Sequence, residues 1–232
     1  MKILVLADIH SNWQALSAID EEFDACVIAG DLVDYGVQPV ECIEWARQHH
    51  AVVIRGNHDH AVAQRVPVKP GNGFRCLAAF ARPMHWEVLS AEHLTWLARI
   101  PVTSYVQLGD MKFFLVHGTP RDPLDEYLTN DPEAWRARLE GIDADFICTG
   151  HTHVPLHIDL DGKHVLNPGS VGQPRDGDPR CSYAIVEDGV VEFKRIDYDI
   201  EETLARYKAT NIERKPMDIV RSVLTTGGRM PS

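Results

Sequence analysis

The chain has 232 residues, of which 44% are hydrophobic and 25% charged, values typical of a globular domain with a buried core. Its formal net charge of −11 at pH 7 argues against a general nucleic-acid binder or an anionic-membrane binder, because such proteins present a basic surface. No stretch approaches the ~20 consecutive apolar residues of a membrane span, and the five cysteines are dispersed without a CxxC pair, so we expect reduced thiols in a cytoplasmic protein.

The first apolar runs predict buried strands that alternate with helices. Residues 3–7 are a continuous apolar run, as in a strand buried on both faces, and strands are also expected at the largely apolar segments 23–29 and 51–54. Helices are expected at about 12–22 and 39–50, after an Asn that can cap the first and at a Pro that opens the second. This order is typical of an open α/β sheet, in which ligands bind at the carboxyl ends of the strands.

The second half of the chain predicts hairpins and further helices. Residues 102–116 predict a hairpin around a Gly-Asp pair, and residues 145–149 predict another buried strand. Two more hairpins are expected at 156–166 and 181–196, each turning at an Asp-Gly pair. A helix is expected at about 200–208, and a short one in the tail that follows.

The segment 60–101 is mainly helical by its pattern, with a Pro- and Gly-containing interruption at 67–73. Neither a repeat nor a linker separates this segment from its neighbours in the sequence. We therefore expect one domain over residues 1–232 that carries a helical insertion or cap at about 60–101.

Polar side chains follow five of the expected strands, each where the strand ends. Those of metal-ligating type are Asp8, His10, Asp31, Asn57, His117, His151 and His153. Residues two apart in an extended segment point the same way, so Asp8 and His10 are expected to aim at one point. One metal ion rarely needs seven protein ligands, whereas two ions that share a carboxylate do. Mixed imidazole and carboxylate ligands favour Mn, Fe, Zn, Co or Ni over Mg or Ca.

Counting charges suggests a reaction for such a centre. Two dications carry four positive charges, of which Asp8, Asp31 and a bridging hydroxide cancel three. The remaining charge of about +1 would hold an anionic phosphoryl group, and the ions would lower the pKa of a bound water. His58, the neighbour of Asn57, is then free to donate a proton to the leaving oxygen.

The ordered series Asp-x-His, Gly-Asp, Gly-Asn-His, His and Gly-His-x-His resembles the calcineurin-like metallophosphoesterase superfamily. Within it, the chain is similar to small phosphodiesterases and phosphatases of the YfcE type. The motifs cover residues 8–153, and Asn167-Pro168-Gly169-Ser170 with Arg175 extends the likeness to about 175. The resemblance implies a four-layer α/β/β/α sandwich of two mixed sheets flanked by helices.

The resemblance also implies roles for the site residues. The ligands of the first metal would be Asp8, His10, Asp31 and His153, and those of the second Asp31, Asn57, His117 and His151. His58 matches the family's proton donor and phosphate contact. Asp34 matches the aspartate that orients this histidine in the protein-phosphatase branch. The candidate substrate contacts are Asn57, His58, Arg175 and Arg55.

The chain departs from its relatives at two positions. Tyr35 stands where the protein phosphatases have a phosphate-binding arginine, and His58 stands where many YfcE-type proteins have cysteine. The sequence leaves the roles of two arginines undecided. Arg175 either binds an anion near the metals or is an exposed loop arginine, and Arg55 either reaches phosphate or pairs with a neighbouring acid.

We expect an enzyme that hydrolyses small phosphate mono- or diesters, with a small, nucleotide-like phosphoester as its partner and Mn as the metal that supports activity. The alternatives within the superfamily are a phosphoprotein phosphatase and a dinucleoside-polyphosphate hydrolase. A non-catalytic scaffold for protein partners is a third reading, which the complete set of ligands disfavours. The sequence leaves open the substrate, the native metals and whether the chain forms a homo-oligomer.

Overall fold

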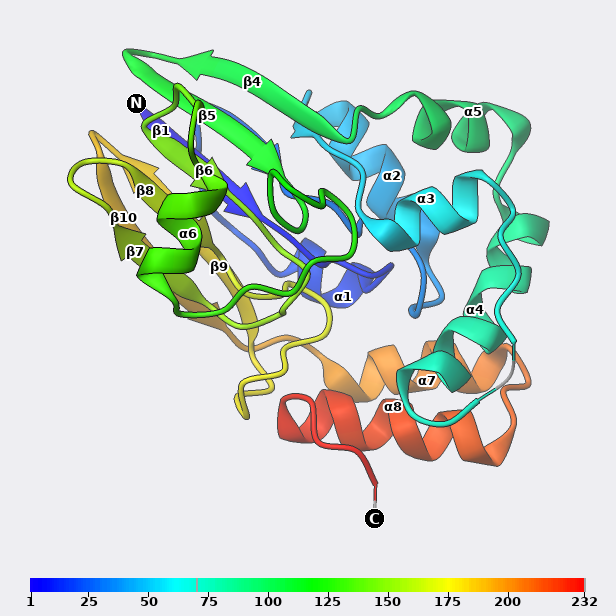
Figure 1. Cartoon of the computed structure of the whole chain (residues 1–232). Coiled ribbons are helices and arrows are strands. Elements are labelled where there is room, and N and C mark those ends of the chain that lie inside the picture. The colour runs from blue at the N-terminus through cyan, green and yellow to red at the C-terminus, as the bar shows by residue number, and fades with distance from the viewer. Residues whose placement is uncertain (70, 232) are drawn as a thin grey trace.

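The computed structural model describes residues 1–69 and 71–231, which form two five-stranded sheets with flanking helices (Figure 1). Pro70, in the interruption expected at 67–73, and Ser232 lie outside the described residues. In chain order, the elements are β1 (Lys2–Leu6), α1 (Trp13–Ser17), β2 (Ala25–Ile28), α2 (Pro39–Gln48), β3 (Val52–Val53), α3 (Asn57–Ala63), α4 (Phe74–Val88), α5 (Ala91–Arg99), β4 (Thr103–Leu108), β5 (Met111–Val116), α6 (Pro132–Arg138), β6 (Phe146–Cys148), β7 (Leu156–Asp159), β8 (His164–Asn167), β9 (Cys181–Glu187), β10 (Val190–Ile196), α7 (Ile200–Ala209) and α8 (Arg214–Thr226).

The first sheet has the strand order β10-β9-β1-β2-β3. Strands β1, β2 and β3 run parallel, with Leu6 opposite Ile28 and Ile28 opposite Val53, while β9 runs antiparallel to both of its neighbours. The carboxyl ends of the three parallel strands therefore lie at one edge, where the polar residues follow them.

The second sheet has the order β4-β5-β6-β8-β7. Strands β5, β6 and β8 are parallel, and β4 and β7 pair antiparallel with them at the two edges. Phe113 of β5 lies opposite Phe146 of β6, and their rings stack with centroids 5.0 Å apart. Both sheets are thus mixed, and each has three adjacent parallel strands, of which β1, β2, β5 and β6 end in a ligand-bearing loop.

The continuous apolar run of β1 is explained by burial on both faces. Ile3 and Val5 pack with Phe113 and Phe146 in the core between the sheets. Leu4 and Leu6 point to the other face, where α1 and α2 cover the first sheet. On the far side, Trp135 of α6 and its neighbours cover the second sheet. The four-layer sandwich predicted from the resemblance is confirmed.

Helix α4 of the segment 60–101 packs with α7 and α8 of the C-terminal region beside the sheets, whereas α5 packs against α3 (Figure 1). Leu77 of α4 shares a buried cluster with Leu204 of α7 and with Val220 and Val223 of α8. None of the described helices is both long and apolar enough to cross a lipid bilayer.

Two helix boundaries differ from the expectation. The helix expected at 12–22 ends at Ser17, and Glu21 beyond it binds Lys2 Nζ at 2.6 Å and the hydroxyl of Tyr183 at 3.1 Å. The short helix expected in the tail is the 13-residue α8, whose buried face includes Ile219. Apolar residues at helical spacing (Val220, Val223 and Leu224) and Gly227 in a left-handed conformation at its C-terminal cap account for the length of α8.

Candidate metal centre

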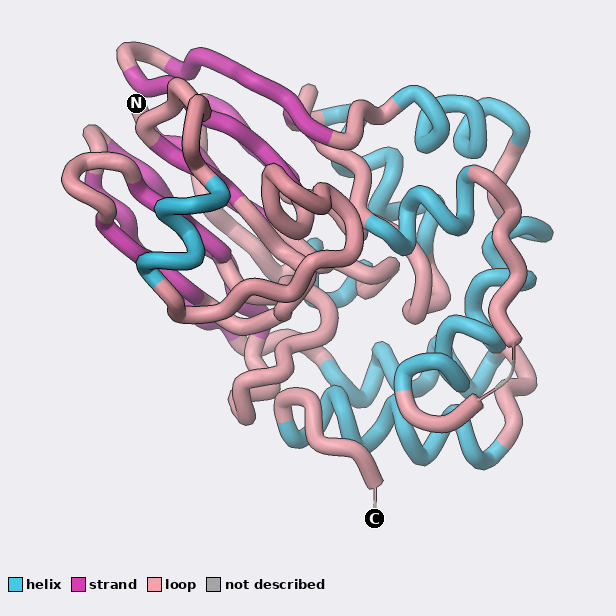
Figure 2. The backbone as a smooth tube through the Cα atoms, viewed as in Figure 1, coloured by secondary structure: helices cyan, strands magenta, loops and turns pink. Residues whose placement is uncertain are grey.

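The candidate ligands lie on the loops that follow β1, β2, β5 and β6 and on the first turn of α3, at the strand ends drawn in Figure 2. Hydrogen bonds tie these loops to one another. The amide of Asp8 donates to the carbonyl of Gly30 at 3.0 Å, and that of Gly150 donates to the carbonyl of His117 at 3.0 Å. Between the sheets, the amide of His151 donates to Oδ1 of Asp8 at 3.2 Å. The two sheets therefore bring their loops to one site.

Several ligand residues have left-handed backbone conformations, with φ of 52° at Asp8, 47° at His10, 52° at Asp31, 69° at His151 and 58° at His153. We expected Asp8 and His10 to point the same way because their segment would be extended. Both side chains reach the site, but the segment is not extended, so that explanation is wrong. Such conformations cost on the order of 1–3 kcal/mol each and cluster at functional sites. Hydrogen bonds such as that from His10 N to Asp31 O, 3.0 Å, hold the loops in this form.

The loops also approach so closely that one position needs a glycine. A Cβ added at Gly56 would lie 2.1 Å from Oδ1 of Asp31 and 2.6 Å from its backbone nitrogen. The missing side chain lets the turn before α3 lie directly against the shared carboxylate.

The first group of ligands comprises four buried residues: Asp8, His10, Asp31 and His153. One ligand atom from each lies within 4.8 Å of the others. Nε2 of His10 is 3.2 Å from Nε2 of His153 and 3.7 Å from Oδ2 of Asp31, and Nε2 of His153 is 3.5 Å from Oδ1 of Asp8. The set has the size and the donor types of a divalent transition-metal site.

The second group comprises Asp31, His117 and His151, again within 4.8 Å of one another. Nε2 of His117 is 3.2 Å from Oδ2 of Asp31. Asn57 lies beside this second group, because the amide of His58, the next residue in the chain, donates to Oδ1 of Asp31 at 2.9 Å. Asp31 is common to both groups.

Each histidine of the two groups makes a hydrogen bond to a backbone carbonyl through its other ring nitrogen. The pairs are His10 Nδ1 with Val33 O at 3.2 Å, His117 Nδ1 with Ala29 O at 2.8 Å, His153 Nδ1 with Gln173 O at 2.6 Å and His151 Nε2 with Asp125 O at 3.3 Å. A carbonyl only accepts, so these nitrogens carry the proton. In the neutral ring, the form that binds a metal, the lone pair of the opposite nitrogen then faces the site.

Four buried atoms of the candidate ligands have no hydrogen-bond partner among the described residues: Asp8 Oδ2, Asp31 Oδ2, Asn57 Oδ1 and His117 Nε2. A buried polar atom without a partner costs on the order of 1–3 kcal/mol. A bound cation would give all four atoms a partner, so the residues present fit a divalent metal centre.

The pKa values of the cluster also indicate that its buried negative charges lack a cation. Burial, together with the carboxylate of Asp31, raises the pKa of Asp8 to about 7. Burial lowers the pKa of His10 to about 3 and that of His151 to about 4. Burial also acts to lower the pKa of His117, but the carboxylates of Asp31 and Asp8 outweigh it and raise this pKa to about 10. The protein alone thus balances the buried carboxylates by holding protons where a cation would serve.

His58 lies beside the groups and contacts a carboxylate of its own. Its Nδ1 is 2.8 Å from Oδ2 of Asp34, and its side chain is 13% exposed. The neighbouring Asp59 is occupied elsewhere, because its carboxylate accepts from the amides of Gly56 at 3.1 Å and Val33 at 3.0 Å. The ring of Tyr35 packs against that of His58 with centroids 4.4 Å apart.

Comparison with known proteins gives the family. The model of the calcineurin-like phosphoesterase superfamily domain matches residues 1–188. The chain belongs to this superfamily. A metallophosphoesterase from Sphaerobacter thermophilus has a similar structure, with a TM-score of 0.82 and 34% identity over 98% of this chain and 99% of that one. The hypothetical protein PH1004 from Pyrococcus horikoshii OT3 shares the fold, with a TM-score of 0.83, 23% identity and coverage of 98% and 99%.

Two curated proteins are also similar. Uncharacterized protein MJ0912 of Methanocaldococcus jannaschii is 31% identical over 227 residues, which cover 86% of this chain and 89% of that protein. Phosphodiesterase YfcE of Escherichia coli strain K12 is 24% identical over 209 residues, covering 82% and 90%. The resemblance inferred from the motifs is confirmed, and the chain is a metallophosphoesterase with a buried His/Asp metal-binding cluster.

The two candidate arginines of this metallophosphoesterase differ in their surroundings. The guanidinium of Arg175 lies 3.8 Å from the ring centroid of Phe74 and donates to Oε1 of Gln173 at 2.9 Å, while its buried Nε has no partner among the described residues. Arg55 instead donates to the carbonyl of Ala98 at 3.3 Å, at the end of α5. Among the described residues, the Arg55 guanidinium thus makes its hydrogen bond to α5 and none to a candidate ligand.

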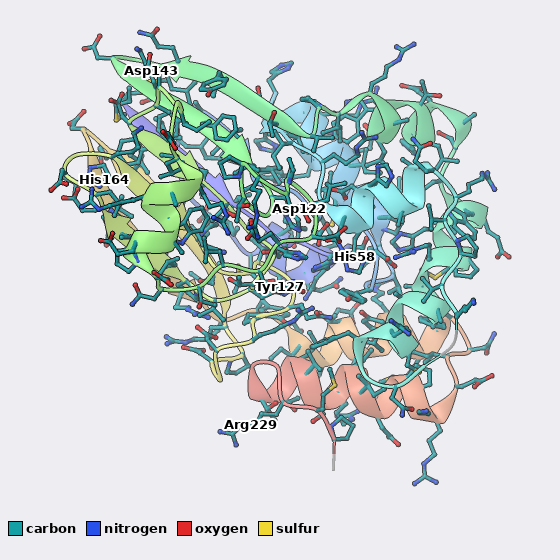
Figure 3. All side chains as sticks on the ribbon, viewed as in Figure 1. His58, Asp122, Tyr127, Asp143, His164 and Arg229 are labelled. Carbon is teal, nitrogen blue, oxygen red and sulfur yellow. The ribbon has the colours of Figure 1, made fainter. Side chains whose placement is uncertain are left out.

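Sequence reasoning missed three residues at the site. Arg82 of α4 donates to Asp34, and Tyr127 covers His151 with ring centroids 3.9 Å apart. His85 of α4 is buried and hydrogen-bonds the carbonyl of Gly36 at 2.9 Å. Figure 3 shows His58 and Tyr127 far from Asp143, which lies at the opposite end of the sheets. The contacts of Arg82, Tyr127 and His85 join distant parts of the chain, and no local motif marks them.

Proposed function

We propose that this protein is a dinuclear metal-dependent phosphoesterase that hydrolyses small phosphate mono- or diesters. The observation that carries the proposal is the pair of buried ligand groups that share Asp31. We assign Asp8, His10, Asp31 and His153 to one ion and Asp31, Asn57, His117 and His151 to the other. When bound, the two ions would supply Lewis acidity and a nucleophile derived from water at neutral pH.

His58 is the proposed proton donor to the leaving oxygen. Asp34 accepts the proton of Nδ1, so the proton that can pass to the leaving oxygen is that of Nε2, and the donor form of His58 is the imidazolium with both nitrogens protonated. The ring hydrogen bond of His58 among the described residues is made by Nδ1, and the partly exposed side chain leaves Nε2 open to a ligand.

Arg175 is the proposed anion contact outside the metals. Its guanidinium is held flat on Phe74 and by Gln173, which fixes the position of the charge without neutralising it. The field of this guanidinium contributes to lowering the pKa of His153 after burial, which indicates that the positive charge lies near the cluster. We leave Arg55 out of the proposed substrate site.

A small diester, for example of a nucleotide, is the substrate class that we favour. The Escherichia coli relative is named a phosphodiesterase, which supports this class by analogy. The alternative of a phosphoprotein phosphatase finds less support, because Tyr35 packs on His58 where that branch has an arginine.

The test combines metal analysis with hydrolysis of an aryl phosphate monoester and an aryl phosphodiester in the presence of Mn. We expect metal bound by the purified protein and turnover that a chelator abolishes and added metal restores. Asp31→Asn removes charge shared by both groups and should lose metal and hydrolysis together. Full activity of the metal-depleted protein would contradict the proposal.

A further inference from the structure

Arg82 of α4 is a buried arginine that binds the carboxylate next to the proposed proton donor. Its side chain is 8% exposed. Nε and a terminal nitrogen of the guanidinium donate to Oδ2 of Asp34 at 3.0 and 2.7 Å, and the other terminal nitrogen donates to the carbonyl of Val66 at 3.0 Å. All three nitrogens are therefore used, and the orientation of the guanidinium is fixed.

Oδ2 of Asp34 also faces Nδ1 of His58 at 2.8 Å, while Oδ1 accepts from the amide of Tyr35 at 2.9 Å. One buried carboxylate oxygen is thus shared between an arginine and the imidazole. Without Arg82, the carboxylate would keep one backbone donor and His58, and its charge would be only partly compensated in a dry environment. A buried charge that loses its partner is strongly destabilised and tends to move or to take up a proton.

A second side chain of α4 holds the same loop. His85 lies three residues after Arg82, hence on the same helix face, and its ring contacts the carbonyl of Gly36 at 2.9 Å and the amide of Asp34 at 3.4 Å. Asp34 itself has φ of 73°, a conformation that a non-glycine residue keeps only where its surroundings impose it. Helix α4 therefore holds the Asp34 loop by contacts to side chain and backbone.

We propose that Arg82 is a positioning residue for proton transfer. This inference rests on the proposed function of His58 as proton donor. Arg82 locks the carboxylate of Asp34 in the rotamer that accepts from Nδ1, so that Nε2 of His58 stays directed at the leaving oxygen. The planar fork of an arginine binds an oxygen through two donors at once, which a lysine cannot reproduce. The helical segment 60–101 thereby acquires a role in the chemistry.

The kinetic test compares Arg82→Met and Arg82→Lys with wild type on aryl and alkyl phosphodiesters. Arg82→Met should lower kcat by about 10- to 100-fold on the alkyl ester, because a misplaced catalytic group loses rate on that scale. The aryl ester, whose leaving group needs less protonation, should lose less, and KM should change little for both. Arg82→Lys should fall between, and it also serves if Arg82→Met fails to fold. Arg47→Met, which breaks an arginine contact from α2 to Glu92 of α5, is the matched control and should leave both rates unchanged.

A double-mutant comparison separates positioning from general damage. In the His58→Ala background, Arg82→Met should cause no further loss on the alkyl ester, since the group that it positions is gone. A loss of the same size on both esters, or an undiminished loss in the His58→Ala background, would overturn the proposal.

The tautomer of His58 provides a readout that needs no activity. Nitrogen NMR of protein labelled at the histidine rings, with the His58 signals assigned from His58→Ala, should show Nδ1 protonated in wild type. Arg82→Met, or Arg82→Lys if only that variant folds, should change the tautomer mixture. Unchanged His58 signals would overturn the positioning role. Wild type that binds metal but hydrolyses neither ester would instead refute the proposed function, and the two failures are distinguishable.

Discussion

At the scale of single residues, His58 is the side chain whose loss should separate metal binding from turnover. It contacts Asp34 and lies outside both ligand groups. His58→Ala should keep its metals and lose about 10²- to 10⁴-fold in kcat, the usual contribution of general acid catalysis. Metal content and rates on aryl and alkyl diesters check this expectation, with His60→Ala, two residues along the same helix, as the control. Equal losses on the two esters would show that His58 is not the proton donor.

Gly56 allows a test of how closely the loops must approach. Its φ of −84° suits any residue, so alanine there acts through crowding alone. The added Cβ would meet Oδ1 of Asp31 at 2.1 Å, and Gly56→Ala should displace the shared carboxylate and lower metal occupancy and hydrolysis together. Gly71→Ala, whose Cβ meets only the flexible side chain of Arg75, is the control. Normal metal content in Gly56→Ala would mean that Asp31 can move without loss of the site.

At the scale of elements, the loop between β5 and α6 supports His151. Glu126 anchors this loop by binding Arg138, Thr119 and Arg121. The adjacent Asp125 supplies the carbonyl that faces His151 Nε2. Loops that orient a ligand in this way typically contribute 10- to 100-fold to metal affinity. Glu126→Gln should therefore weaken binding of the ion assigned to His151 by roughly 10-fold, as measured by metal titration. Glu133→Gln, exposed on α6, should leave the affinity unchanged.

The lowered pKa of Glu126 predicts that its stabilising effect is lost in acid. The hydrogen bond from Arg138 holds its pKa down to about 2, against about 4.3 for an unperturbed glutamate. Because the folded pKa is the lower one, the stabilisation is present above about pH 4.3 and is lost as the pH falls towards 2. The difference in unfolding free energy between wild type and Glu126→Gln should therefore shrink over that interval, as measured by denaturant unfolding at each pH. A difference that stays constant from pH 6 to pH 2 would contradict this assignment.

The elements that could be predicted from the sequence are those with a local signal. The apolar run of β1 and the Asp-Gly turns predicted strands and hairpins, because burial on both faces and tight turns each demand particular residue types. Arg82 could not be predicted, because its partner Asp34 comes from another part of the chain and only the packing of α4 brings the two together. The left-handed conformations of Asp8 and His10 were missed for the same reason, since contacts between loops impose them. That residues 60–101 form an insertion in a single domain stays a prediction.

At the scale of the whole molecule, the site joins the two sheets. Asp8, Asp31 and Asn57 follow strands of the first sheet, whereas His117, His151 and His153 follow strands of the second. An ion held by residues from both sheets would link the halves of the sandwich and would bind the folded chain in preference to the unfolded one. Binding then stabilises the native state by RT ln(1 + [L]/Kd), about 2.7 kcal/mol at a free metal concentration of 100 Kd.

For a chain of this size, 1 kcal/mol shifts Tm by about 2–4 °C, so a chelator should lower Tm by roughly 5–11 °C from the value in excess metal. The shift should diminish as the pH falls, because the imidazoles and carboxylates must be deprotonated to bind a cation. Thermal unfolding of wild type with and without Mn, at pH 7.5 and pH 5.5, checks both expectations. Asp31→Asn lacks the shared carboxylate, and its Tm should barely respond to metal. An equal response of wild type and Asp31→Asn would place the stabilising metal somewhere other than between the two sheets.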